Sequence, residues 1–564
     1  MAFQPRKIKR KALPLKNFSP LFLFPYENRA EKVKKKLLLI GGWFFPLFFL
    51  FFVFLTLFLR GRQEKVSFFF SQLSPSFLYS LRVSLFSTLL SLFLGFWISI
   101  LGFRLLRFLR FYLHIFFGLV LVLPPVIVGF TWAQILSDSS WGGRILLILF
   151  PNSFYSWKST FGLGLSYVYF NLPLVILVFW NRLEQISQTN FQIGQQWGFQ
   201  EWDCIRFLFW PNLKNTALHF GLLIFLFCFQ DFNLGAFFAQ RPQETVFSFA
   251  IYQSLMLDLD WNKTLFFSLF SLFPSTIYWV FLFFFLTKTP KPSPGKGTTQ
   301  WLGTGKKGVL FFCYLGMAVA CVFFALPIIH TLYHLHFISL KEQLFSSSFS
   351  NALAYSLALG FVSSFLALSL SLFYQWAGSS APKSTSLVGR FFENANLATS
   401  LFLAFPGIVL AMAAFLFLQS FDFIRFPAVQ FLTLAIVQSF SLISLYVFLF
   451  QEPFLWHKQR YFLLKTSLGL SFFEQFTLVD WPGLKKTCIL AFSLCFILSL
   501  GDYSAITVLG QGQRTLSLLS KDLASHYLFD KALANNSLLF FLCFLIFTVS
   551  LLFTHPFSDA KSRY

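Results

Sequence analysis

Two stretches of this chain repeat one pattern: GFQEWDCIRFLFWPNLKNT at 198–216 and GLSFFEQFTLVDWPGLKKT at 469–487. Sliding the sequence by 271 residues superposes a Gly, a Trp-Pro pair, a Leu, a Lys and a Thr, and the register continues without a gap to Asp231 and Asp502. Apolar matches carry little weight in a chain with 88 phenylalanines, but the other matches are hard to obtain by chance. The chain therefore contains an internal duplication.

The composition is that of a membrane protein. Of 564 residues, 56% are hydrophobic and only 12% are charged, whereas soluble domains carry about a quarter charged residues. The net charge of +23 comes from 44 Lys and Arg against 21 Asp and Glu, in short basic runs between long apolar segments. This pattern indicates membrane topology. The predicted partner is the lipid bilayer, and nucleic acid is excluded.

The apolar segments predict an all-α polytopic membrane protein. A spanning helix needs about 20 mostly apolar residues, and this criterion predicts about twelve spans in two parallel six-helix repeats. The expected spans are 37–59, 78–102, 111–132, 161–181, 216–238, 264–287, 308–328, 351–376, 397–419, 429–450, 487–508 and 533–554.

A Pro-, Gly-, Thr- and Lys-rich linker divides the chain. The predicted domains are a basic tail at 1–36, a first repeat at 37–287, the linker at 288–307 and a second repeat at 308–556. With the tail inside, about 31 of the 44 Lys and Arg lie in cytoplasmic segments. Both termini are then cytoplasmic.

The repeated pattern falls in a predicted cytoplasmic loop of about 30 residues before the fifth helix of each half, where most connections are shorter. Gly198 and Gly469 are expected to end a short helix in the left-handed conformation. Pro211 and Pro482, thirteen positions later, suit the first turn of the next membrane helix.

Between the Gly and the Pro, apolar residues at helical spacing predict a short amphipathic helix across the cytoplasmic end. These residues are Trp202, Ile205 and Phe209 in the first copy and Phe473, Phe476 and Val479 in the second. A single helix of this kind is also explained as an interfacial anchor. Two at matched positions favour a grip on a two-fold symmetric soluble partner.

The spacing of Gly to Pro resembles the signature loop of the permease subunits of ATP-binding-cassette (ABC) importers, and two loops on one chain resemble the fused iron(III) and thiamine permeases. The thiamine branch is the more similar. The pieces that carry the resemblance are Phe170-Asn171-Leu172-Pro173, Arg206-Phe207 with Trp210-Pro211, Ala250-Ile251-Tyr252-Gln253, Phe405-Pro406-Gly407-Ile408-Val409-Leu410, Leu500-Gly501-Asp502-Tyr503 and Arg514-Thr515-Leu516. The chain departs from the family at both loop openings, Gln192-Ile193-Gly194 and Leu463-Leu464-Lys465, where the family has Glu-Ala-Ala.

The resemblance implies a type I importer permease in the bacterial inner membrane, translocating thiamine or thiamine phosphates by ATP-driven alternating access. Its implied partners are an ATP-binding cassette ATPase dimer, which binds ATP and Mg, and a periplasmic or extracellular substrate-binding protein. The residues implied to couple to the ATPase are Gly198, Trp202, Ile205, Arg206, Pro211, Gly469, Phe473, Phe476 and Pro482.

The chain itself is expected to bind no cofactor and to catalyse no reaction. A phosphate-cradling loop would read GxxxxGK[ST], and the nearest stretches, at 295–297 and 305–307, lack both the spacing and the hydroxyl after lysine. No HExxH zinc motif and no GxSxG nucleophile motif is present. ATP hydrolysis is therefore assigned to the partner.

The matched aspartates, Asp231 and Asp502, allow two interpretations. Asp231 lies about fifteen residues into its expected helix, or roughly 23 Å. Ionisable groups at such depth usually face a bundle interior or a wet cavity, which would place both in the translocation pathway. Alternatively, each carboxylate caps a broken helix end or pairs with an arginine, such as Arg241 or Arg514.

Proline also predicts breaks in the third span of each half. Pro124-Pro125 and Pro406-Gly407 are expected to kink or break these helices, which membrane bundles tolerate.

Other functions remain open from the sequence. An iron(III) importer permease would show the same loops. An ion-coupled secondary transporter would also show parallel repeats, but it needs carboxylates near the midplane and no long loops. A noncatalytic scaffold leaves the matched aspartates unexplained. No residue in the sequence identifies the substrate.

Overall fold

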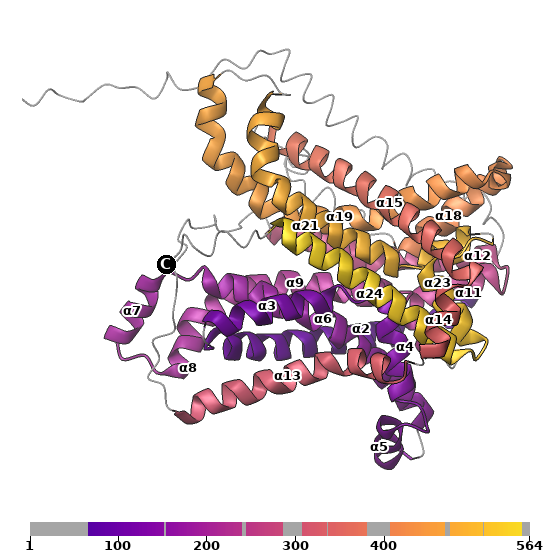
Figure 1. Ribbon diagram of the computed structural model, residues 1–564, viewed down its shortest axis with the longest axis horizontal. Helices are drawn as coiled ribbons and strands as arrows, with labels where there is room; N and C mark the ends of the chain where they lie inside the picture. Colours follow the sequence, from indigo (N-terminus) through magenta and orange to yellow (C-terminus); the bar gives the residue numbers. More distant parts are fainter. Residues whose placement is uncertain are drawn as a thin grey trace, which may run out of the picture.

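The computed structural model describes residues 66–105, 107–151, 154–239, 244–285, 307–335, 337–380, 406–468, 474–510 and 512–554. These residues form an elongated bundle of helices (Figure 1), and no strand occurs among them. The predicted span 37–59, Gly469 and Phe473 lie outside the described residues.

The helices of the first half are α2 (Val66–Phe103), α3 (Arg107–Leu121), α4 (Pro125–Ile135), α5 (Trp141–Leu149), α6 (Phe154–Glu184), α7 (Gln188–Gln196), α8 (Glu201–Asp203), the π-helical turn η2 (Cys204–Phe209), α9 (Trp210–Gln230), α10 (Gly235–Phe238), α11 (Phe247–Met256) and α12 (Trp261–Phe285).

The helices of the second half are α13 (Lys307–Tyr333), α14 (Phe337–Leu344), α15 (Ser347–Ser380), α18 (Gly407–Ser420), the 3₁₀ turn η6 (Phe423–Arg425), α19 (Pro427–Leu468), the π-helical turn η7 (Gln475–Asp480), α21 (Trp481–Gly501), α22 (Ser504–Leu509), α23 (Leu516–Ser525) and α24 (Phe529–Thr554).

The described residues contain seven helices long and apolar enough to cross a membrane, or eight if one bent pair counts as a span. The predicted class, an all-α polytopic membrane protein, is confirmed. The seven are Pro75–Phe103, Lys158–Glu184, Glu201–Gln230, Phe311–Tyr333, Ser347–Gln375, Phe476–Gly501 and Phe529–Thr554.

The bent pair corrects the single span expected over 111–132. α3 and α4 meet at 89° across a break at Val122–Pro124. Pro124 has extended backbone (φ −58°, ψ 139°), and neither it nor Pro125 has an N–H to continue the helix. Pro406, with ψ 137°, likewise precedes the first residue of α18. The break predicted at Pro124-Pro125 is confirmed, whereas at Pro406 the described residues show only that α18 begins directly after the proline.

The spans expected over 216–238 and 487–508 also end early. α9 stops at Gln230 and α21 at Gly501, and the aspartate that follows each has ψ near 130° (129° and 126°). The chain then restarts as the short helices α10 and α22. The apolar run that predicted each span therefore covers a membrane helix and a broken end.

The duplication recurs in the helix bounds. The turn η7 and the helix α21 follow η2 and α9 at the same offset of 271 residues, and the elements have equal lengths of six and 21 residues in both copies. Each copy then continues with a short helix, a ten-residue helix and a long C-terminal helix, because α10, α11 and α12 correspond in order to α22, α23 and α24.

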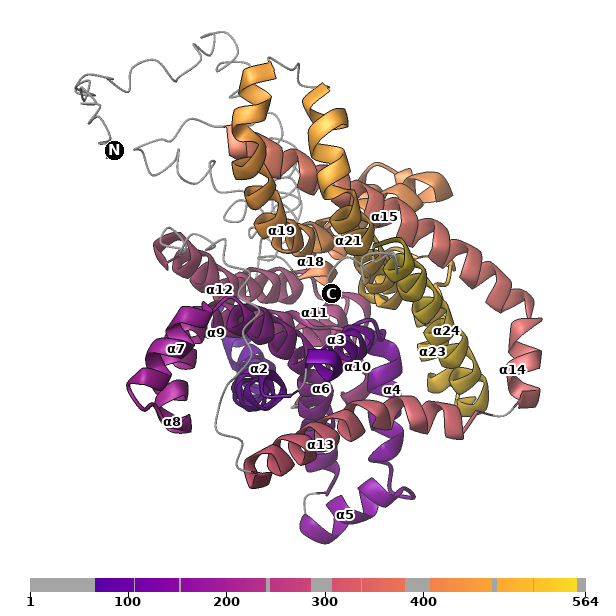
Figure 2. The same cartoon turned by 60° about the vertical axis from the view of Figure 1, so that its left-hand side comes forward.

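The first helix of the second half crosses over to the first half. α13 packs against α2 and α4, and Figures 1 and 2 show it alongside the N-terminal helices. Tyr169 Oη of α6 donates a hydrogen bond to the Phe324 carbonyl at 2.7 Å, and the hydroxyls of Thr131 and Thr331 lie 3.1 Å apart. The predicted boundary at 308 therefore does not separate two independently packed bodies.

Candidate functional site

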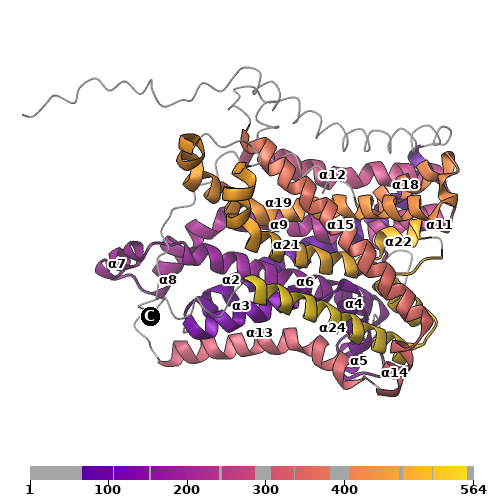
Figure 3. The ribbon, with the colours of Figure 1, turned by 45° about the horizontal axis from the view of Figure 1, so that its top comes forward.

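The two repeated segments lie toward the same end of the bundle. α7 and α8 occupy the left side of Figures 1 and 3, and the end of α19 and the start of α21 lie toward that side in both views. α11, α14 and α23 lie at the other end. We call this left-hand end the loop end and the opposite one the seam end.

Gly198 ends α7 as its position predicted. Its φ is +70°, which glycine adopts at no steric cost. The Phe199 N–H donates to the Gly194 carbonyl at 2.9 Å and the Gly198 N–H to the Gln195 carbonyl at 3.0 Å. This pair of bonds is a Schellman motif, which satisfies the last carbonyls of α7.

The segment after Gly198 differs from the prediction. The separate amphipathic helix expected before Pro211 is instead the first part of one long helix, Glu201–Gln230. A π-helical turn joins its two parts, in which the Trp210 N–H donates to the Ile205 carbonyl. The wider turn accommodates Pro211, because proline lacks the N–H and clashes with the carbonyl four residues earlier in a regular α-helix.

The second copy contains the same device. The Trp481 N–H donates to the Phe476 carbonyl, 271 residues after the first bond, and Pro482 follows. Pro482 and Pro211 are therefore early residues of their helices after a π turn. Sequence reasoning missed the π turns, although the repeated Trp-Pro pair marks both.

The π turn also changes which side chains face outward. Phe209 is buried and Ile205 half-buried, but Trp202 is 63% exposed and Phe476 is also exposed. An extra residue in a turn rotates what precedes it by about 100° relative to the rest of the helix. The predicted single apolar face is therefore split, and Trp202 and Phe476 point away from the core.

The outward side chains form an exposed aromatic and aliphatic surface at the loop end, which we call the loop-end patch. Two pairs match across the duplication, Phe207 with Leu478 and Trp210 with Trp481. Arg206 is exposed and its guanidinium lies 5.4 Å from the Phe207 ring centroid. The patch consists of Ile193, Trp197, Trp202, Phe207 and Trp210 in the first copy and Phe476, Leu478 and Trp481 in the second. Exposed apolar surfaces of this kind mark interaction sites.

An ion pair holds the first segment to the bundle. Arg104 Nη1, at the end of α2, lies 3.1 Å from Glu201 Oε2, and the arginine side chain is only 8% exposed. The first acidic residue after the loop opening therefore pairs within the chain.

A different pair holds the second segment. His457 Nε2 of α19 lies 3.2 Å from Asp480 Oδ1. The imidazole rests on Gly483, where an added Cβ would come within 2.2 Å of His457 Cε1. The two segments are thus tied to long helices, α2 and α19, through residues that do not correspond in the duplication and that the sequence match could not reveal.

At the seam end, both matched aspartates cap broken helices. Asp231 Oδ2 accepts hydrogen bonds from the Leu234 N–H at 2.9 Å and the Gly235 N–H at 3.1 Å. Asp502 Oδ1 accepts from the Ser504 N–H at 2.9 Å. The capping interpretation is therefore confirmed, and the translocation-pathway role remains a prediction.

Of the two arginines predicted as alternative partners of these aspartates, Arg514 pairs with a different carboxylate. Arg514 Nε lies 3.4 Å from Asp522 Oδ2, and Arg241 lies outside the described residues. Asp502 Oδ1 instead accepts a hydrogen bond from Asn233 Nδ2 at 3.0 Å. Because Asn233 belongs to the first half, this bond crosses between the halves.

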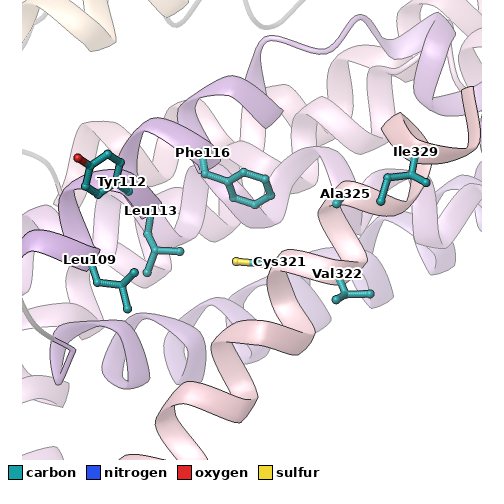
Figure 4. Close-up of a pocket in the computed structure, with 8 residues that line it drawn as sticks. All are labelled: Leu109, Tyr112, Leu113, Phe116, Cys321, Val322, Ala325 and Ile329. Carbon is teal, nitrogen blue, oxygen red and sulfur yellow. The ribbon is translucent and has the colours of Figure 1, made fainter. Parts of the chain in front are cut away.

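A groove of about 430 Å³ between α3 and α13 is a poor candidate for binding a polar solute (Figure 4). Solute sites need a few converging polar groups, and the only side-chain heteroatoms in the lining are a phenol oxygen and a sulfur. The groove is lined by Leu109, Tyr112, Leu113, Phe116, Cys321, Val322, Ala325 and Ile329.

No family model matches the chain, but individual proteins do. The thiamine transport system permease protein ThiP of Haemophilus influenzae is 28% identical over 506 residues, which are 86% of this chain and 88% of that protein. The Escherichia coli protein of the same name is 26% identical over 438 residues, 77% and 80% of the two chains. That of Brucella abortus is 27% identical over 380 residues, 66% and 67%. The resemblance to importer permeases that the repeated loops predicted is confirmed.

Proposed function

We propose that this chain is the permease subunit of an ABC importer that moves thiamine or thiamine phosphates into the cytoplasm. The observation that carries the proposal is the pair of repeated segments at one end of a polytopic bundle, each with a π turn before Trp-Pro. The relatives named above, all thiamine transport permeases, support the substrate class.

The loop-end patch is the proposed docking surface for an ATPase dimer. Two matched exposed surfaces on one chain suit two copies of a soluble subunit. In this proposal the ATPase binds ATP and Mg, and the permease contributes Gly198, Trp202, Ile205, Arg206 and Pro211 from one segment. The second segment contributes Gly469, Phe473, Phe476 and Pro482.

Transport follows from a difference in packing between two states. ATP-driven closure of the dimer would draw the two segments together and tilt α9 and α21, which the ion pairs of Glu201 and Asp480 tie to the bundle. Nucleotide shifts the equilibrium only as far as its affinity differs between inward- and outward-open states. A substrate-binding protein would deliver the solute to the seam end, and both termini would lie in the cytoplasm.

The caps at Asp231 and Asp502 weigh against an ion-coupled secondary transporter. Such a transporter needs carboxylates free to exchange protons or sodium near the midplane. Each carboxylate here accepts backbone N–H bonds at a helix end through one of its oxygens, and this use of the oxygen competes with reversible ion binding.

Uptake of labelled thiamine and labelled ferric iron, in cells with the gene deleted and then restored, tests the proposal. We expect restored thiamine uptake that depends on a copurifying ATPase. Restored iron uptake alone would replace thiamine with iron(III) as the substrate. Thiamine uptake that continues without an ATPase but collapses with the ion gradient would refute the ABC mechanism.

A further inference from the structure

A lysine ammonium lies against two aromatic rings where the halves meet at the seam end. Lys521 Nζ of α23 is 5.4 Å from the ring centroid of Phe232 and 5.0 Å from that of Tyr503. Phe232 follows α9 in the first half, whereas Tyr503 and Lys521 belong to the second half. Both rings are buried, and the lysine is half-buried. We call Phe232 and Tyr503 the seam cage.

The cage is fixed from both sides. The two rings are 5.8 Å apart at 64°, so their faces do not stack on each other. Tyr252 packs edge-on against Phe232 at 5.4 Å. The Tyr503 hydroxyl donates to the Asn233 carbonyl, and the Tyr503 N–H donates to Asn233 Oδ1 at 3.4 Å. The ring positions are thus set by contacts across the seam.

The acidic residue next to Lys521 in the chain is shared with an arginine. Asp522, next to Lys521, lies 3.4 Å from the guanidinium of Arg514. Burial lowers the pKa of the Lys521 ammonium from its ordinary value of 10.5, and Asp522 acts in the opposite direction. The Lys521 ammonium therefore contacts two aromatic rings in place of part of its hydration shell. The carboxylate of Asp522 is paired with Arg514.

We propose that the seam cage is a binding subsite for an organic ring cation, which Lys521 occupies in this structure as an internal competitor. The assignment rests on the proposed function and adds the residues that the permease itself offers to a cationic substrate. Ring faces attract a cation, and the attraction is stronger when water is excluded. Because an ammonium is strongly hydrated, a ring cation without N–H donors on its charged nitrogen loses less on entering the cage.

Competition between Lys521 and a bound cation also links ligand binding to the contact between the two halves. While Lys521 fills the cage, one cation of the second half contacts a ring of each half. A cation that displaces the lysine removes this link between Lys521 and Phe232. Binding of a substrate cation at this subsite would therefore remove a contact between the two halves.

The test measures binding of labelled thiamine to the full chain in nanodiscs by equilibrium dialysis, without a binding protein. Lys521→Met removes the ammonium and keeps an unbranched side chain. We expect about tenfold tighter thiamine binding than in the wild type, a change equivalent to about 1.4 kcal/mol. Adding Tyr503→Leu should abolish the gain. Lys521→Arg, which keeps a cation over the rings, should bind no more tightly than the wild type.

Two controls test whether the gain needs the removal of this particular lysine and whether it needs a charged ligand. The matched variant is Lys531→Met, which removes one exposed lysine from α24 and should leave the affinity unchanged. Thiochrome, a neutral relative of thiamine, should gain nothing from Lys521→Met. Unchanged thiamine affinity in a Lys521→Met chain that melts at the wild-type temperature would overturn the subsite, as would an equal gain for thiochrome.

The same measurement distinguishes this inference from the proposed function. N-methylpyridinium, a ring cation unrelated to thiamine, serves as a second probe. If cells restored with the gene take up no thiamine but Lys521→Met tightens N-methylpyridinium about tenfold, the cage stands and the thiamine assignment fails. If uptake is normal and neither cation gains, the cage is refuted while the transport function stands.

Discussion

Replacing Gly198 with valine should uncouple ATP hydrolysis from substrate while leaving membrane insertion intact. At φ +70° a residue with a side chain is strained by roughly 1–2 kcal/mol, and β-branching increases that cost. If the backbone relaxes instead, the two hydrogen bonds that end α7 are lost, at about 1 kcal/mol each. Either way the cost is about 2 kcal/mol, or roughly 30-fold in an equilibrium constant.

The assay is ATPase activity of the reconstituted complex, with and without loaded binding protein. We expect the substrate-stimulated ATPase activity to fall by on the order of 30-fold, toward the basal rate. This expectation holds if stimulation is proportional to the fraction of chains whose repeated segments are docked on the ATPase. The same substitution at Gly469 should have the same effect. Gly198→Asn should retain most of the stimulation, because asparagine tolerates the left-handed region.

Gly512 offers a matched control. Its φ is +92°, and an added Cβ meets nothing within 4 Å at either glycine. Gly512→Val therefore introduces comparable strain outside the loop end, between α22 and α23. Normal stimulation in both Gly198→Val and Gly469→Val, or equal loss in Gly512→Val, would remove the role assigned to the loops.

Other predictions concern the loop end. Gly483→Ala should push the imidazole of His457 away from Asp480, cost about 1–3 kcal/mol as overpacking does, and lower both the melting temperature and coupling; an unchanged melting temperature would show that the ring moves without loss. Trp210→Ala should leave the melting temperature within a few degrees of the wild type yet reduce the amount of ATPase that copurifies. Trp141→Ala, at an equally exposed tryptophan of α5, should copurify normally, and parity between the two tryptophan variants would argue against the loop-end patch as the docking surface.

Much of the architecture could be predicted from local features of the sequence. Apolar runs of membrane length identified the helices, Pro124-Pro125 identified a break, and Pro406 marked the start of α18, because a missing N–H acts on the helix that contains it. The left-handed conformation of Gly198 was also predictable from local sequence, because it depends on the missing Cβ of that residue and on the end of the helix just before it.

Features that depend on distant partners were not predictable in this way. The pair Arg104–Glu201 joins residues 97 positions apart, and no local pattern distinguishes this arginine from others in the basic runs. The outward turn of Trp202 follows from a π turn, which the Trp-Pro pair marks but which the helical spacing of the apolar residues does not predict. The early end of α9 was missed because Asp231 sits within an apolar run that continues past it.

One helix connects the two regions that carry the proposals. Residues 201–230 form a single span, about 45 Å long at 1.5 Å per residue, with the loop-end patch at its start and Asp231 and Phe232 directly after its end. Phe232 lies two residues after the last residue of α9, and the Asp231 side chain joins this connection to the start of α10. We expect a tilt imposed at Trp210 to load the contacts of Phe232 and Asn233 with the second half, which holds Tyr503 and Lys521. If docking at the loop end changes thiamine affinity at the seam cage, thiamine must change the affinity for docking by the same factor.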